Sequence, residues 1–306
     1  MENGEEMQTL IKAARSGSVQ SVKQALEFGI DVDALSSDHW TALMAASEEG
    51  HTDVVELLLA NQANVDTKDL DGATALYIAC YYGQVGAARA LLASGAAIEM
   101  ADDQGFTALM SASEKGYADV VELLLANNAN VDTQLPNGDT ALNIACWYGQ
   151  VGAVVGAVRA LLASGAAIEL ADDQGITPLM SASLKGHTDV VELLLANKAS
   201  VNTQLPNGAT ALKVACEHGQ VGAVRALLAS GAAIELADDR GVTPLMSASK
   251  NGHTDVVKLL LPNARQAAQD PSMCLISQPT GGMTEVKPTQ PNRWDATWGE
   301  AATRDC

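Results

Sequence analysis

Short amphipathic runs alternate with polar turns along most of the chain. In one such stretch, Thr41 precedes an apolar run that ends at Gly50, and Thr52 and Asp53 precede a second run. Threonine before an apolar run is typical of a helix N-cap, and glycine after it is typical of a helix C-terminus. Residues 54–59 give the second helix an apolar face that must be covered. The pattern predicts pairs of short helices that need a neighbour to bury them.

The same helix pair recurs at a fixed spacing. Thr followed by Ala-Leu or Pro-Leu begins seven units, at Thr41, Thr74, Thr107, Thr140, Thr177, Thr210 and Thr243. The spacing is 33 residues throughout, except for 37 residues after Thr140, where the VGAV of residues 151–154 is repeated at 155–158. Stacked units of this kind bury one continuous core, so the repeat predicts a solenoid. The insertion near 151–158 predicts either one extra helical turn or a surface bulge.

Two kinds of polar turn connect the units. Residues 135–138 and 205–208 both read Leu-Pro-Asn-Gly, whereas residues 102–105 and 172–175 both read Asp-Asp-Gln-Gly. Type I β-turns prefer Pro at the second position, Asp at the first and Gly at the fourth. We therefore interpret the Asp-Asp pairs as turn formers, in preference to metal ligands or an acid–base pair.

The units alternate between two sequences. A units, which begin at Thr41, Thr107, Thr177 and Thr243, contain GHTDVV or a close variant, and B units between them contain GQVGA. B units place a glycine after their second helix, and A units replace it by Gln62, Asn128 and Lys198. A residue other than glycine in left-handed geometry costs about 1 kcal/mol, so we expect the A units to be less stable.

The 33-residue unit of a turn and two helices, beginning Thr-Pro-Leu, resembles the ankyrin repeat. The resemblance covers residues 36–263 as seven repeats, and residues 7–35 resemble a more polar N-terminal capping repeat. It implies an all-α ankyrin-repeat solenoid of about eight units joined by β-turn or hairpin tips. The histidine that the family carries after Thr-Pro-Leu is replaced by Met44, Tyr77, Met110, Asn143, Met180, Lys213 and Met246. The hydrogen bonds of that histidine are therefore not expected here.

The two ends of the chain depart from the repeat. Residues 1–6 form an N-terminal extension, and Pro262 is expected to end the last helix. Residues 264–306 are rich in proline and lack a sustained period, which predicts a disordered tail. Trp294 and Trp298 in this tail would share one helix face. They would fold over the last repeat, bind another protein, or have no specific role.

Composition narrows the classes of partner and compartment. The net charge is −19, which argues against nucleic acid and anionic membranes as ligands. Neither a signal peptide nor a membrane-spanning run is expected from the sequence. Five widely spaced cysteines do not make a disulfide framework, and Cys80, Cys146 and Cys216 share one B-unit position that we interpret as core. We expect a monomeric intracellular protein, cytoplasmic or nuclear, that is not secreted.

Catalytic motifs do not emerge from the sequence. It contains no HExxH, CxxC, phosphate loop or Ser/His/Asp ordering. His51, His187 and His253 recur at one position that other units fill with Tyr or Gln, so we interpret this position as structural. We expect no enzyme activity, no cofactor and no metal.

The resemblance implies that the turn tips and the exposed ends of the first helices form a concave binding face. Trp40 and Phe106 fall at tips, and pairs of aromatic residues fall just before the helix-ending glycine, at 81–82 and 147–148. Tyr77 lies one turn before Tyr81. Exposed aromatic residues are enriched in binding hot spots, so they indicate a protein-binding site. The alternative is partial burial of these rings against neighbouring repeats.

Charged and apolar side chains extend the same surface, with acidic residues early and basic residues late. The predicted protein-binding residues are Trp40, Glu48, Glu49, Tyr77, Tyr81, Tyr82, Phe106, Trp147, Tyr148, Ile176, Leu184, Lys185, Lys213 and Arg240. This order favours a partner with an apolar or aromatic anchor whose basic groups meet the N-terminal end. The favoured function is a non-catalytic protein-interaction module, such as an adaptor, scaffold or regulatory subunit. The alternatives are targeting repeats of a longer enzyme (a kinase, phosphatase or ubiquitin-ligase complex) and a structural spacer without a specific ligand.

Overall fold

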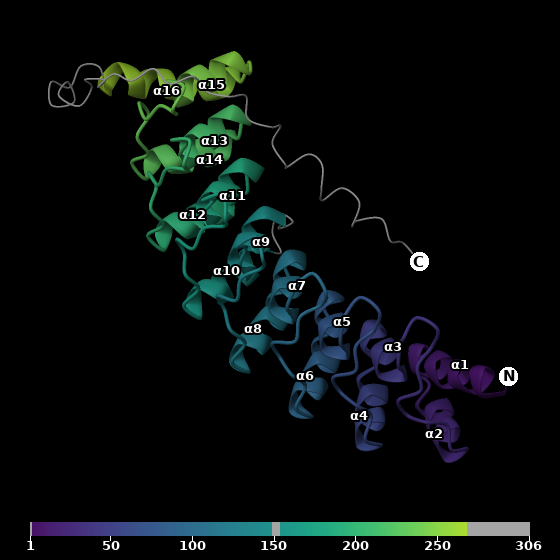
Figure 1. Ribbon diagram of the computed structural model, residues 1–306. Coiled ribbons are helices and arrows are strands. Elements are labelled where there is room, and N and C mark those ends of the chain that lie inside the picture. The colour runs from purple at the N-terminus through teal and green to yellow at the C-terminus, as the bar shows by residue number, and fades with distance from the viewer. Residues whose placement is uncertain (1, 149–153, 268–306) are drawn as a thin grey trace. The chain divides into compact units, whose positions relative to one another are not determined.

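The computed structural model describes residues 2–148 and 154–267, which form sixteen helices (Figure 1). The helices are α1 (Glu2–Arg15), α2 (Val19–Glu27), α3 (Ala42–Glu49), α4 (Thr52–Ala60), α5 (Ala75–Tyr81), α6 (Val85–Ala93), α7 (Ala108–Lys115), α8 (Ala118–Ala126), α9 (Ala141–Tyr148), α10 (Val154–Ala163), α11 (Pro178–Lys185), α12 (Thr188–Ala196), α13 (Ala211–Glu217), α14 (Val221–Ala229), α15 (Pro244–Lys250) and α16 (Thr254–Ala267).

Each unit contributes an odd-numbered first helix and an even-numbered second helix. First helices pack on first helices from α1 to α15, and second helices pack on second helices from α2 to α14 (Figure 1). Among the residues described, the tips contribute two isolated β-bridges, Ala101–Thr107 and Gln204–Thr210. The expected all-α solenoid of helix pairs is therefore confirmed.

The helix boundaries follow from the capping residues. The Thr41 hydroxyl accepts a hydrogen bond from the Met44 amide at 3.1 Å, and the same bond recurs in each of the seven units. The bond satisfies one of the amides that a helix N-terminus leaves unpaired. Gly50 ends α3 with a φ of 75°, a left-handed conformation that glycine adopts without steric cost.

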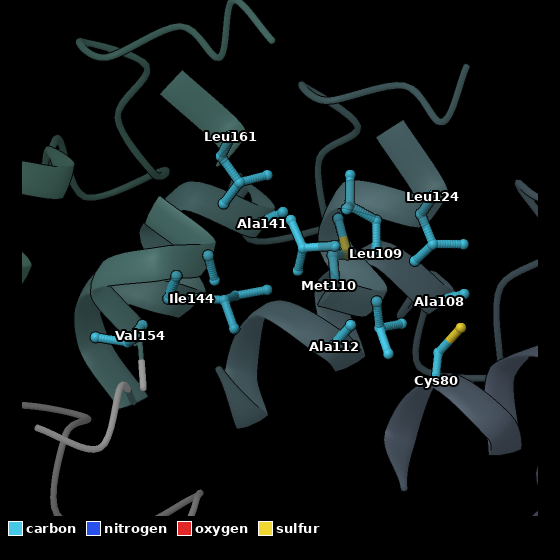
Figure 2. Close-up of a cluster of buried hydrophobic side chains, with 14 of the residues drawn as sticks. Cys80, Ala108, Leu109, Met110, Ala112, Leu124, Ala141, Ile144, Val154 and Leu161 are labelled. Atoms are coloured by element: carbon cyan, nitrogen blue, oxygen red, sulfur yellow. The ribbon is translucent and has the colours of Figure 1, made fainter. Parts of the chain in front are cut away.

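The core consists of small and aliphatic side chains between the two rows of helices. Figure 2 shows Met110 and Leu109 of α7 beside Leu124 of α8 and Ile144 of α9, all of which are buried. Burial of each such leucine stabilises the fold by roughly 1.5–3 kcal/mol. Cys80, Cys146 and Cys216 are fully buried, as predicted for a core position.

A hydrogen bond to the end of the preceding first helix links most neighbouring units. Gln84 Nε2 donates to the Glu48 carbonyl at 2.9 Å, and Gln220 Nε2 donates to the Leu184 carbonyl at 2.9 Å. The same position supplies a histidine ring nitrogen to the carbonyls of Arg15, Cys146 and Glu217, from His51, His187 and His253. A Cβ on Gly50 would overlap the Gln84 side chain, so this glycine also makes room for the bond. The interpretation of this histidine position as structural is thus confirmed.

Two further ladders join the turns. After each second helix from α2 to α12, a carboxylate or amide oxygen accepts the backbone N–H of the next unit at 2.6–2.9 Å; the acceptors are Asp33, Asp66, Glu99, Asp132, Glu169 and Asn202. At the tips, the amides of Asp103, Asp173 and Asp239 donate to carbonyls of the preceding tips at 2.9–3.0 Å. These bonds connect the units where the family histidine is missing.

Both terminal helices extend beyond the limits expected from the sequence. Helix α1 begins at Glu2, so it includes the residues interpreted as an extension. The expectation that Pro262 ends the last helix was wrong, because α16 continues through Pro262 to Ala267. Proline has a helical φ and removes one backbone hydrogen bond, which one extra turn can tolerate. Residues 149–153, which include the start of the insertion, and residues 268–306, which include the tail's tryptophan pair, lie outside the described residues.

Left-handed backbone occurs after the second helices in both kinds of unit. Gln62, Asn128 and Lys198 of the A units have φ values of 65°, 64° and 68°. The equivalent glycines of the B units have open space where a Cβ would lie, so only backbone strain distinguishes the two kinds of unit at this position. The strain predicted for the A units is therefore present.

We predict that Gln84→Ala lowers the free energy of unfolding by about 1 kcal/mol, because the Glu48 carbonyl loses its donor. Urea unfolding measures the change. Gln24→Ala, at an exposed position of α2, is the matched control and should change stability by less than about 0.5 kcal/mol. Equal effects of the two substitutions would contradict the role of the bond.

We predict that Lys198→Gly raises the free energy of unfolding by roughly 0.5–1 kcal/mol, because glycine relieves the left-handed strain. Thermal unfolding measures this as a higher midpoint. Lys23→Gly within α2 should instead lower stability by about 1 kcal/mol, since glycine is a poor helix former. A destabilising Lys198→Gly would show that the lysine side chain itself supports the turn.

Candidate functional site

The candidate site is the row of side chains at the ends of the first helices, which we name the first-helix face. It comprises the two residues before each helix-ending glycine or its equivalent, which are Arg15, Ser16, Glu48, Glu49, Tyr81, Tyr82, Glu114, Lys115, Trp147, Tyr148, Leu184, Lys185, Glu217, His218, Lys250 and Asn251. In each first helix from α3 to α13, the positions before these two residues are largely buried, so only the last turn of the helix reaches solvent. The face therefore carries two side chains from every unit.

Three tyrosines gather at α5. The rings of Tyr77 and Tyr81 stack with centroids 6.4 Å apart, and Tyr82 meets Tyr81 edge-on at 5.1 Å. Lys115 of the next unit places Nζ 4.3 Å from the centre of the Tyr81 ring. Burial, followed by the charge of Asp102, raises the pKa of Tyr77 far above its usual value. The cluster is thus a packed platform on which Tyr82 stays 47% exposed.

A second aromatic pair lies two units further on, at α9. Lys185 Nζ lies 3.8 Å from the centre of the Trp147 ring, and burial lowers the pKa of this lysine. Tyr148 is 36% exposed. Burial, then the charges of Glu114 and Asp139, raise the pKa of Tyr148 to about 12. Each aromatic B unit is therefore followed by an A-unit lysine that stacks back onto its ring.

The N-terminal capping unit contributes to the face through Arg15. Its guanidinium lies 5.3 Å from the Trp40 ring centre, and its Nη1 lies 3.0 Å from Glu48 Oε2. The charge of Glu48 is therefore balanced within the protein. Glu49 is exposed and remains the acidic side chain that this end offers to a partner.

Two residues predicted for the surface are buried instead. Phe106 is 9% exposed and belongs to the hydrophobic core. Moving its apolar ring from water into the core is favourable, which explains this burial. Lys213 is 3% exposed because it fills the position that holds a buried methionine in three A units. Its Nζ lies 3.3 Å from Asp238 Oδ2 and 3.5 Å from Glu217 Oε2. The expected exposure of Phe106 and Lys213 was wrong.

Asp238 explains how a lysine can be buried there. Burial acts to raise the pKa of Asp238, but the Val242 amide and the Arg240 and Lys213 side chains hold it at about 2. Arg240 is exposed and pairs with Asp238 at 3.0 Å. This pairing, and the burial of Lys213, remove much of the basic character expected for the later units.

The other predicted residues lie where expected or are partly covered. Trp40, Tyr77 and Ile176 pack against the core while keeping part of their surface in solvent, which matches the alternative of partial burial. Leu184 is half-buried and Lys185 is exposed. Sequence reasoning missed Arg15, Lys115 and Asp139. The signal for Lys115 was its position just before Gly116, one unit after Tyr82.

Asp139 is a tip carboxylate that sits among other carboxylates. It accepts a hydrogen bond from Asn137 Nδ2 at 2.8 Å. Burial raises the pKa of Asp139 to about 6; the Asn137 bond opposes the shift, and Asp172 and Asp173 add to it. At the tips before and after this one, Asp102 and Asp172 accept two backbone amides each, which confirms them as turn formers.

The described residues contain no group of three or more His, Cys, Asp or Glu side chains that could hold a metal ion. In the same part of the chain, no helix is long and apolar enough to cross a membrane. Burial raises the pKa of the Cys216 thiol to about 12 and raises the pKa of Cys80 and Cys146 further. A thiol with a raised pKa is a poor nucleophile, which fits a structural role for the three cysteines.

We predict that Asp139→Asn raises the thermal midpoint at pH 7.5 and that the gain disappears near pH 4. The pKa of the Asp139 carboxyl is about 6 in the folded protein and near 3.8 in the unfolded chain. The free energy of unfolding of the wild type therefore falls as the pH rises through this window. The amide cannot ionise and avoids this loss. Glu122→Gln, an exposed change on α8, is the control. A gain that is the same at both pH values would contradict the prediction.

The comparisons with known proteins agree with this architecture. A family model described as ankyrin repeats (3 copies) matches residues 1–69, 59–135, 127–204 and 197–270. The crystal structure of the human ASB11 ankyrin repeat domain is similar, with a TM-score of 0.65 and 29% identity over 72% of this chain and 96% of that chain. No curated protein matches the sequence. The four family matches together span residues 1–270, so this chain belongs to the ankyrin repeat family.

Proposed function

We propose that this chain is a non-catalytic adaptor, scaffold or regulatory subunit that binds a protein partner through the first-helix face. Ankyrin repeats are in general protein-interaction modules. The observation that carries the proposal is the aromatic clustering at α5 and α9. The chain has only 4% aromatic residues, yet four of them, Tyr81, Tyr82, Trp147 and Tyr148, lie at the ends of these two helices. Tyr82 and Tyr148 expose 47% and 36% of their surface.

The construction of the face supports binding rather than chemistry. Its rings are held by stacking and by the lysines of the following units, so a partner meets a preorganised surface. The charged side chains that stabilise it, Arg15 with Glu48 and Lys115 with Glu114, are paired within the protein. Any catalysis in a complex would then belong to the partner.

A pull-down from lysate with three matched baits tests the proposal. The baits are the wild type, the variant Tyr82→Ala/Trp147→Ala/Tyr148→Ala, and the control variant Phe28→Ala/Val221→Ala/Leu261→Ala. The control removes three exposed apolar side chains that lie on or next to second helices, away from the first-helix face. Circular dichroism and the thermal midpoint establish that all three baits fold.

We expect a protein that the wild type and the control retain and that the face variant loses, because hot-spot truncation costs at least about 2 kcal/mol of binding energy. Loss from both triple variants, or retention by both, would place the interaction elsewhere on the chain. If none of the baits retains a specific protein, the spacer interpretation is favoured.

A further inference from the structure

The exposed tyrosines of the first-helix face lie beside carboxylates. Tyr82 follows directly on α5, and Glu48 of the preceding unit lies close enough to contribute to the raised pKa of its hydroxyl, after burial. Tyr148 has Glu114 on the preceding unit and Asp139 on its own tip as its charged neighbours. Glu49 is exposed at the end of α3. Each exposed ring therefore has carboxylates nearby. Glu48 is paired with Arg15 and Glu114 with Lys115, so the negative charge open to a partner comes from Glu49 and Asp139.

The face already accommodates cations on its rings. Lys115 lies over Tyr81 at 4.3 Å, Lys185 over Trp147 at 3.8 Å, and Arg15 near Trp40 at 5.3 Å. These three contacts, at 3.8–5.3 Å from the ring centres, show that ammonium and guanidinium groups pack on the rings of this surface. The exposed ring surface of Tyr82 and Tyr148 offers the same kind of contact to a cation from outside.

The charge of this part of the face favours a positively charged partner segment. The chain carries a net charge of −19, and the lysine between the two tyrosines, Lys115, is engaged with Glu114 at 3.2 Å. The tips above the face add the exposed carboxylates of Asp103 and Asp173. An acidic segment would meet repulsion along this stretch, whereas a basic segment would be attracted.

We propose that the part of the first-helix face from Glu49 to Tyr148 binds an extended basic segment of a partner protein, with one Arg or Lys on Tyr82 and another on Tyr148. The inference rests on the proposed function and names the chemistry of its partner. It assigns Tyr82 and Tyr148 as the cation-binding rings and Glu49 as the residue that attracts the end of the segment near α3.

The repeat spacing sets the distance between the two cations. Tyr82 and Tyr148 are two units apart, and packed helices lie about 8–10 Å apart, so the rings are separated by roughly 16–20 Å. An extended chain rises about 3.3 Å per residue and alternates its side chains between two faces. Basic residues six positions apart therefore span about 20 Å and point to the same side. Residues three positions apart span about 10 Å and point to opposite sides.

The probe is a fluorescein-labelled nine-residue peptide with Arg at positions 2 and 8 in a Gly/Ser/Leu background. The control peptides are one with Arg at positions 2 and 5 and one with Glu at positions 2 and 8. Fluorescence anisotropy measures binding to the full chain at 50 mM and at 300 mM salt. The protein variants are Tyr82→Ala/Tyr148→Ala, Glu49→Gln, and the controls Phe28→Ala/Leu261→Ala and Glu56→Gln.

We expect saturable binding of the 2,8-Arg peptide that weakens several-fold at the higher salt concentration, because exposed charges are screened. The double tyrosine variant should weaken binding about tenfold, since two cation–π contacts are lost. Glu49→Gln should weaken it about two- to threefold. The control variants should bind as the wild type does, and the two control peptides should bind at least about fivefold more weakly.

The inference is overturned if the 2,8-Arg peptide does not bind at millimolar concentration in 50 mM salt. It is equally overturned if both Arg spacings bind alike or if the double tyrosine variant binds like the wild type. A lysate partner that the face variant loses, combined with no peptide binding, would leave the proposed function standing and remove only the basic segment. Peptide binding without a lysate partner that the face variant loses would support the basic-segment site and leave the proposed function without support.

Discussion

The hydrogen bond that joins most units to the end of the preceding first helix is the constraint on which the site depends. Its acceptors include the carbonyls of Glu48, Leu184 and Glu217, which are themselves residues of the first-helix face. The donor satisfies a carbonyl that a helix C-terminus would otherwise leave exposed. The interaction that holds consecutive units together therefore also fixes the backbone of the residues that a partner would meet. At the junction next to Tyr81, Tyr117 takes the donor position and packs its ring on Gly83.

The alternation of A and B units gives the face its composition. Both kinds of unit form the same helix pair and the same turn ladder, so the stack is regular although the sequences differ. The B units supply the rings of Tyr81 and Trp147, and the following A units supply Lys115 and Lys185. Neither kind of unit makes this surface alone. The site is formed by a B unit together with the A unit that follows it. The third B unit lacks the aromatic pair, because the same positions hold Glu217 and His218.

The sequence predicted features that depend on neighbouring residues and failed on features that depend on distant ones. Threonine caps, helix-ending glycines and aspartate turns are local, so the helix boundaries and the left-handed Lys198 followed from the repeat. The burial of Lys213 depends on Asp238 in the next unit, and no residue near Lys213 in the sequence indicates that pairing. The stacking of lysines on rings likewise requires the position of one layer relative to the next. The position of each residue within its repeat could be predicted from the sequence, whereas its degree of burial could not.

The acidity of the chain has a structural origin that is separate from any partner. Asp33, Asp66, Glu99, Asp132 and Glu169 accept backbone amides between units, and Asp102, Asp172 and Asp238 shape the tips. These carboxylates would be required whether or not the protein bound a basic ligand. Net charge alone therefore does not identify a binding site. What distinguishes the stretch from Glu49 to Tyr148 is that carboxylates lie beside exposed rings that the fold does not need to expose.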